Sequence, residues 1–111
     1  MDLINDIENL IVRLNNSVKK LKEYGTELAT TERDYKITLR QEALKLRQEK
    51  NMPVTLISQI IYGVPEVAEK RFKRDVAETM YNTAQENINS IKLLLRILEN
   101  QVNREWNNNE R

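Results

Sequence analysis

The sequence predicts an all-α protein: an elongated antiparallel helical hairpin or coiled coil with a short capping helix at its turn. The 111 residues include only two glycines and two prolines, whereas β architectures need turn residues at intervals of about 8–12 residues. Aromatic residues make up 5% of the chain and charged residues 32%. Two long stretches repeat apolar residues at alternating spacings of three and four, which is the pattern of helices that pack along a seam.

The first arm is expected over residues 3–50, which contain no proline and a single glycine, Gly25. The regular spacing weakens after Leu28, and Thr31 followed by Asp34 resembles a helix-capping arrangement. A kink or a new helix start at 25–31 is therefore an open alternative. The predicted seam of this arm is Ile4, Ile7, Ile11, Leu14, Val18, Leu21, Gly25, Leu28, Glu32, Tyr35, Leu39, Glu42 and Leu46.

The turn and the second arm follow from the remaining glycine and the prolines. Pro53 ends the first arm because the residue before a proline disfavours helical backbone angles, and residues 54–62 form a short helix that Gly63 stops. Pro65 suits the first turn of the next helix, so a second arm is expected over 66–106, with a frayed tail at 107–111. The seam of the second arm is Ala77, Tyr81, Ala84, Ile88, Ile91, Leu95, Leu98 and Val102.

Residues 1–111 are thus expected to form one helical domain. Near the N-terminus and near the C-terminus of the chain, the helices carry more apolar residues than a two-helix hairpin can cover. A helix that is apolar nearly all round must be covered on several sides, so we expect a homodimer that completes a four-helix bundle. The alternative is a three-helix fold-back within one chain, if the first arm breaks at Gly25. The predicted self-association residues are Leu3, Ile4, Ile7, Leu10, Ile11, Leu14, Ile91, Leu94, Leu95 and Leu98.

Composition argues against catalysis and against any cofactor. The chain has no cysteine and no histidine, which removes thiolate and imidazole metal ligands, disulfides and histidine-based catalysis. The pairs Glu66/Glu69 and Asp75/Glu78 lie one turn apart, as magnesium ligands do in all-helical nucleotide pyrophosphatases, but neighbouring Lys and Arg residues neutralise them. We expect no enzyme, no cofactor and no metal.

A cytoplasmic protein without a membrane span is expected. The first residues carry acids and no basic segment, unlike a secretory signal. The longest uncharged run, Asn51 to Pro65, has fifteen residues, fewer than the ~20 apolar residues that cross a bilayer.

Basic residues gather on both sides of the predicted turn and provide a nucleic-acid alternative, although interleaved acids leave residues 30–79 with a balance of only +2 (ten basic, eight acidic). The helix–glycine–helix layout around Gly63 resembles a helix-turn-helix, but Gln59 and Glu69 fit that motif poorly. The nucleic-acid candidates are Arg40, Lys45, Arg47, Lys50, Lys70, Arg71, Lys73 and Arg74. The candidates for binding a protein partner are Leu56, Ile57, Ile60, Ile61 and Phe72.

Six short segments carry a resemblance to a known family: Thr31–Tyr35, Arg40–Glu42, Met52–Thr55, Arg74–Glu78, Ile97–Gln101 and Arg104–Trp106. They resemble a small, uncharacterised all-helical protein family encoded in the early regions of temperate phages and prophages of Gram-positive bacteria. The resemblance covers roughly residues 30–106 and implies a phage-derived cytoplasmic protein that works near replication, recombination or host takeover. It assigns no site residues. We therefore expect a non-catalytic module that binds and modulates another protein, and a DNA- or RNA-binding accessory protein is the alternative.

Overall fold

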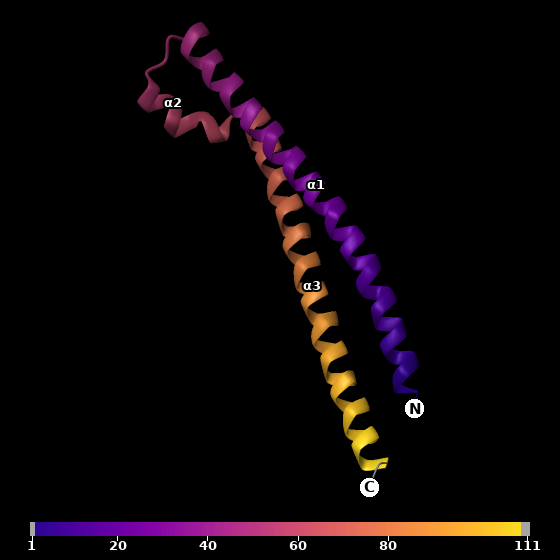
Figure 1. The fold of residues 1–111 in the computed structure, drawn as a ribbon. Helices are drawn as coiled ribbons and strands as arrows, with labels where there is room; N and C mark the ends of the chain where they lie inside the picture. The colour runs from indigo at the N-terminus through magenta and orange to yellow at the C-terminus, as the bar shows by residue number, and fades with distance from the viewer. Residues whose placement is uncertain (1, 110–111) are drawn as a thin grey trace. The chain divides into compact units, whose positions relative to one another are not determined.

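The computed structural model describes residues 2–109, and every regular element in that range is helical (Figure 1). The elements are α1 (Leu3–Glu49), α2 (Val54–Ile60), the 3₁₀ turn η1 (Ile61–Gly63) and α3 (Pro65–Asn109). The all-α prediction is confirmed. Helix α3 begins at Pro65 and continues past Trp106 to Asn109, so the expected frayed tail is helical up to that residue. Glu110 and Arg111 lie outside the described residues.

The chain divides into two compact units, which are described separately. The loop unit is Tyr24–Tyr81 and contains the second half of α1, α2, η1 and the start of α3. The terminal unit combines the described residues up to Glu23 with those from Asn82 onward, that is, the first part of α1 and the rest of α3.

Helix α1 is continuous through the region where a break was considered. The Thr31 hydroxyl donates to the backbone carbonyls of Glu27 (2.9 Å) and Leu28 (3.1 Å), one turn earlier, rather than capping a new helix. A Cβ at Gly25 would lie 3.3 Å from Cε2 of Tyr81. Gly25 therefore makes room for a tyrosine ring and does not interrupt the helix. The three-helix fold-back required a break at Gly25 and is not adopted.

Local hydrogen bonds explain where the helices begin and end. The Asp2 carboxylate accepts from the Asn5 backbone N–H (3.1 Å) and so caps the start of α1. After α1 the backbone of Asn51 turns into the left-handed region (φ 51°), which asparagine tolerates better than most residues. The Met52 N–H then bonds to the Leu46 carbonyl (3.2 Å). Gly63 has no positive φ, so the left-handed turn falls at Asn51.

The loop unit has a small core to which all of its elements contribute. Tyr35 of α1, Ile57 of α2, Ile61 of η1 and Val67 of α3 are buried together. Val67 is fully buried. Partly buried side chains pack around this core, namely Leu39, Ala43, Leu46, Met52 and Val64. Burial of this apolar surface holds α2 and η1 against the long helices.

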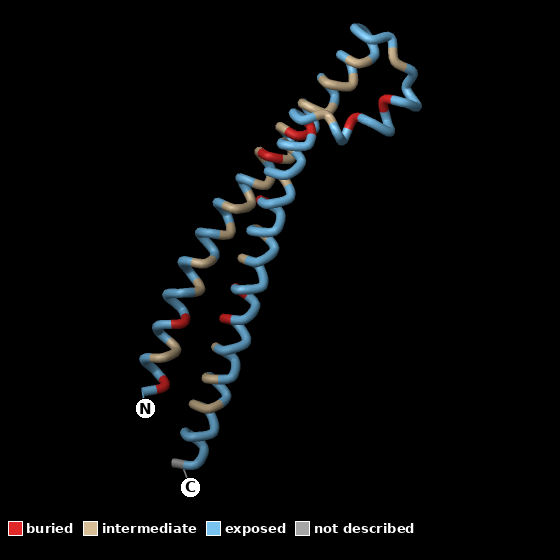
Figure 2. The backbone as a smooth tube through the Cα atoms, turned by 180° about the vertical axis from the view of Figure 1, so that it is seen from behind, coloured by how far each residue is buried: buried red, intermediate tan, exposed pale blue. Residues whose placement is uncertain are grey.

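Buried positions recur along both long helices (Figure 2). Every predicted seam residue of α3, from Ala77 to Val102, is buried or half-buried, so that seam is confirmed. Ten of the thirteen predicted seam residues of α1, from Ile7 to Leu46, are also buried or half-buried. The three exceptions lie in the terminal unit: Ile4, Ile11 and Val18 are exposed there. The residue before each of them is buried or half-buried instead, namely Leu3, Leu10 and Ser17. Both choices keep the alternating spacing, so the pattern alone could not separate them.

Candidate interaction sites

Three of the five predicted partner-binding residues are accessible. Leu56, Ile60 and Phe72 are exposed. Ile57 and Ile61 are in the core of the loop unit and do not face solvent. The difference follows from helical periodicity: Ile57 and Ile61 lie one turn apart and face the core, whereas Leu56 and Ile60 are exposed.

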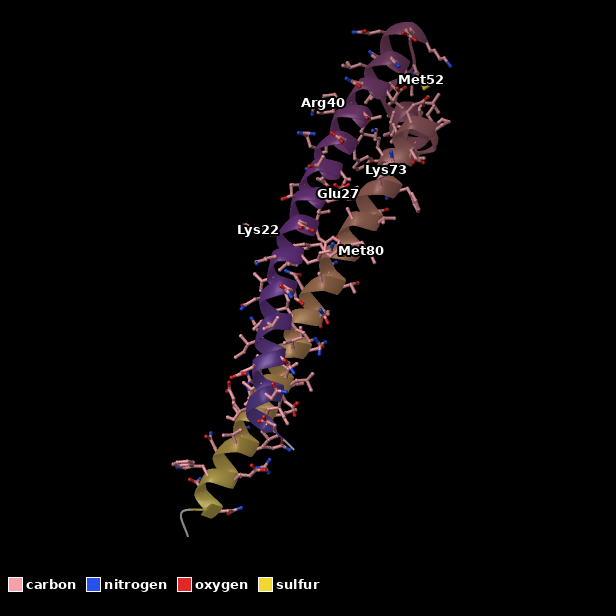
Figure 3. All side chains as sticks on the ribbon, turned by 90° about the vertical axis from the view of Figure 1, so that its right-hand side faces the viewer. Lys22, Glu27, Arg40, Met52, Lys73 and Met80 are labelled. Carbon is pink, nitrogen blue, oxygen red and sulfur yellow. The ribbon has the colours of Figure 1, made fainter. Side chains whose placement is uncertain are left out.

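Phe72 belongs to a groove between α1 and α3 inside the loop unit, with a volume of about 470 Å³. Glu27 of α1 and Lys73 and Met80 of α3 are labelled in Figure 3. The sequence reading missed most of this groove. A signal was present, because Phe72, Val76 and Met80 are spaced one turn apart outside the seam. The residues that line the groove are Tyr24, Glu27, Phe72, Lys73, Val76, Ala77 and Met80.

The groove combines a mainly apolar surface with one acid and one base. Phe72 is 63% exposed, and Val76 and Met80 are also exposed, so large apolar groups face water there. The Lys73 ammonium lies 4.0 Å from the Glu69 carboxylate on the same helix, and Glu27 belongs to the opposite helix. This arrangement suits an apolar ligand that also carries charged groups, since it offers both contact area and polar orientation.

Most of the nucleic-acid candidates are engaged within the loop unit. Lys45 pairs with Glu42 (3.2 Å), and the Arg47 guanidinium donates to the Met52 carbonyl (3.0 Å). Arg71 lies over the Tyr62 ring at 5.1 Å from its centroid. Lys73 and Arg74 form ion pairs with Glu69 and Glu32, so five of the eight nucleic-acid candidates are engaged in this way. Within residues 2–109, Arg40, Lys50 and Lys70 form no ion pair.

Arg74 joins α1 and α3 inside the loop unit. Its guanidinium donates to the carboxylates of Glu32 (3.0 Å) and Asp75 (2.8 Å), and it lies 5.0 Å from the centroid of the Tyr35 ring. The hydrogen bond from Arg74 lowers the pKa of Glu32, and the bonds to Glu32 and then Asp75 raise the pKa of Arg74. Arg74 therefore stabilises the contact between the helices, and two carboxylates already neutralise its charge.

The predicted self-association residues fall into three groups in the terminal unit. Leu3, Leu10 and Ile91 are buried inside the unit. Ile7, Leu14, Leu95 and Leu98 are half-buried along its seam. Ile4, Ile11 and Leu94 are exposed. The last group is the part of the predicted set that a second molecule can reach without unpacking the chain.

Among residues 2–109 no group of three acidic side chains converges to hold a metal ion. No helix in the same range has the length and apolar character needed to cross a membrane.

In comparisons with known proteins, no protein-family model, curated protein sequence or solved structure matches the chain.

Proposed function

We propose that this protein is a non-catalytic interaction module that binds another protein through the groove of the loop unit and modulates it. The observation that carries the proposal is the exposed apolar row Phe72, Val76 and Met80 along that groove. Contiguous apolar surface rimmed by polar groups is typical of protein-binding sites. A groove between two helices can receive the apolar face of a helix from a partner.

The nucleic-acid alternative has less support. Phosphate binding depends on basic groups that can neutralise the backbone of DNA or RNA. Five of the eight candidates already contact acids, a carbonyl oxygen or an aromatic ring in the loop unit. Aromatic residues for stacking on bases are also few, since the chain has one tryptophan, four tyrosines and one phenylalanine.

A quantitative capture experiment tests the groove. Three baits are compared in an extract of the producing cell: the natural chain, Phe72→Ser and Leu44→Ser. Leu44 is an exposed apolar residue of α1 that does not line the groove, so it is the matched control. We expect a partner that the natural chain and Leu44→Ser retain and Phe72→Ser loses, while circular dichroism shows equal helix content.

Two outcomes contradict the groove proposal. One is an identical set of captured proteins for all three baits. The other is binding of DNA or RNA at low salt that weakens steeply as salt rises and that Phe72→Ser leaves unchanged, because this would support the nucleic-acid alternative.

We also propose that α1 and α3 pair as an antiparallel hairpin or coiled coil, closed at its turn by α2. Contacts inside each unit support one antiparallel register. Within the loop unit, Gly25 lies against Tyr81, and Arg74 donates to the Glu32 carboxylate. Glu32 lies about two turns after Gly25 on α1, whereas Arg74 lies about two turns before Tyr81 on α3. The two helices therefore run in opposite directions. Within the terminal unit, the Asn87 amide donates to the Ser17 hydroxyl (3.4 Å) and so also joins α3 to α1.

Homodimerisation into a four-helix bundle is part of the same proposal. Ile4, Ile11 and Leu94 remain exposed in the terminal unit, and a second molecule would cover apolar surface there. Sedimentation equilibrium at micromolar concentration should report a mass of twice 13.1 kDa. A single species at the chain mass would refute self-association.

The resemblance to the phage family supports a cellular setting for this module. A small, cofactor-free helical protein can act by occupying a surface of a host or phage enzyme. We therefore place it in phage DNA metabolism or host takeover, in the cytoplasm of the host cell. Capture from an extract that contains phage replication proteins, with the three baits above, tests this setting.

A further inference from the structure

A second apolar stripe runs along α1 in the terminal unit, beside the buried seam. Ile4, Ile11 and Val18 are 58%, 44% and 49% exposed, although each directly follows a seam residue. Their spacing of seven residues places all three on one side of the helix. The stripe is symmetric in sequence about Ile11, since Ile4 and Val18 lie at equal distances from it.

The charges of the same stretch change sign near Ile11. Asp2, Asp6 and Glu8 precede Ile11, with no base among residues 2–8. The basic residues of the following stretch, 13–22, which contains no acid, are Arg13, Lys19, Lys20 and Lys22. The helix dipole accounts for acids at the start of α1. It does not account for bases in the interior of a helix that continues to Glu49.

We propose that the occupant of this stripe is a second copy of the chain, docked with its α1 antiparallel and with the two-fold axis at Ile11. Ile11 then meets Ile11 of the second copy, and Ile4 meets Val18. The acidic stretch of each copy lies beside the basic stretch of the other. A parallel pairing would place acid beside acid and base beside base, which is unfavourable. A two-fold interface uses the same patch of both molecules, and a stripe that is symmetric about one residue meets that requirement.

This proposal rests on the self-association proposed above and adds its orientation and its residues. It also removes Leu94 from the interface. Ile11 follows a buried seam residue of α1, whereas Leu94 precedes a seam residue of α3. In an antiparallel pair of helices, the residues that precede the seam on the two helices share one side, and those that follow it share the other.

The loop unit shows this rule directly. Glu27 precedes the half-buried Leu28 and Lys73 precedes the half-buried Arg74, and both line the groove with Phe72. Gly25 follows the half-buried Tyr24 and Glu78 follows the buried Ala77, and both line a different hollow of about 430 Å³ beside Tyr81. By the same register in the terminal unit, Ile11 and Leu94 lie on opposite sides, so a single two-fold interface at Ile11 leaves Leu94 outside it.

Cysteine cross-linking tests the orientation, because the natural chain has no cysteine and an introduced thiol can bond only to its counterpart. Four full-length variants are oxidised at micromolar concentration: Ile4→Cys, Ile11→Cys, Val18→Cys and Leu94→Cys. We expect Ile11→Cys alone to form a covalent dimer. Ile4→Cys alone and Val18→Cys alone should stay monomeric on a denaturing gel, whereas their mixture should form a covalent dimer. Leu94→Cys is the control and should stay monomeric.

Other outcomes overturn the proposal in distinguishable ways. Covalent dimers of Ile4→Cys alone and of Val18→Cys alone indicate parallel helices. A covalent dimer of Leu94→Cys without one of Ile11→Cys moves the interface to the other face. If sedimentation shows one chain and no variant cross-links, self-association itself fails. The groove proposal is judged separately by Phe72→Ser, which lies in the loop unit.

Discussion

The loop unit and the terminal unit cover their apolar side chains in different ways. In the loop unit, α2 and η1 join the two long helices, and four elements surround Tyr35, Ile57, Ile61 and Val67. The regular structure of the terminal unit, among its described residues, is confined to stretches of α1 and α3. Its seam buries Leu3, Leu10, Ile88 and Ile91, but a neighbouring stripe on α1 stays exposed.

The polar contacts between α1 and α3 also differ between the two units. Arg74 bonds Glu32 across the two helices of the loop unit at 3.0 Å and lies over the Tyr35 ring. In the terminal unit, the amide of the exposed Asn87 donates to the Ser17 hydroxyl at the longer distance of 3.4 Å. The comparison teaches that two helices can bury one seam, and that a third element is needed to cover a wider apolar face. In the loop unit α2 and η1 fill that role. In the terminal unit we propose that a second molecule does.

The largest expected effect concerns the core of the loop unit. Ile61→Ala should lower the free energy of unfolding by about 2–5 kcal/mol, because it leaves a cavity in a packed site. The preceding residue provides the control: Ile60→Ala should cost at least about 1 kcal/mol less than Ile61→Ala, since Ile60 is 38% exposed and Ile61 only 4%. Urea denaturation followed by circular dichroism measures both. Equal losses would show that η1 is not held in a core.

A smaller effect, visible as a pH dependence, concerns the Arg74–Glu32 contact. The folded pKa of Glu32 lies below its ordinary value of 4.5 because Arg74 donates to its carboxylate. The unfolded chain therefore takes up this proton more readily than the folded one, and the stability that Glu32 contributes is lost as pH falls from about 5 to 3. The melting temperature of the natural chain should fall more over this range than that of Glu32→Gln.

The control for this titration is Glu49→Gln, which alters an exposed carboxylate at the end of α1 that forms no ion pair within residues 2–109. Its melting curve should follow that of the natural chain across the same pH range. If Glu32→Gln also follows the natural chain, the contact between Arg74 and Glu32 does not contribute to the stability of the loop unit.

The smallest effect is expected for the polar contact of the terminal unit. Asn87→Ala should change the free energy of unfolding by no more than about 0.5 kcal/mol, because the bond is long and Asn87 is exposed. Asn89→Ala, at a neighbouring exposed position, should behave alike in the same urea titration. A clearly larger loss for Asn87→Ala would mean that polar contacts hold this unit as they hold the loop unit.

Much of the helical organisation can be read from the residues. Pro53 and Pro65 mark the end of the first arm and the start of α3, because each proline restricts the backbone locally. The seam of α3 is also predictable from Ala77 to Val102 because its residues recur at alternating spacings of three and four. These features depend on neighbours in sequence, and short-range sterics and periodicity are sufficient to predict them.

The functional candidates were harder to predict. Ile57 and Ile61 are as apolar as Leu56 and Ile60, and composition cannot tell which pair packs inward. Arg74 reads as a phosphate ligand until its contacts with Glu32 and Tyr35 are seen. The groove between Tyr24 and Met80 requires two helices to meet, so no single stretch of sequence contains it.

The amino-acid order was enough to establish helices, their approximate ends, the seam of α3 and the absence of histidine and cysteine chemistry. It left open whether Leu3 and Leu10 or Ile4 and Ile11 face inward, and whether Gly25 breaks a helix or receives the Tyr81 ring. Those outcomes depended on how α1 and α3 pack within each unit. The physical reason is that spacing along a helix reports its period, whereas the side from which another helix approaches depends on residues far away in the chain.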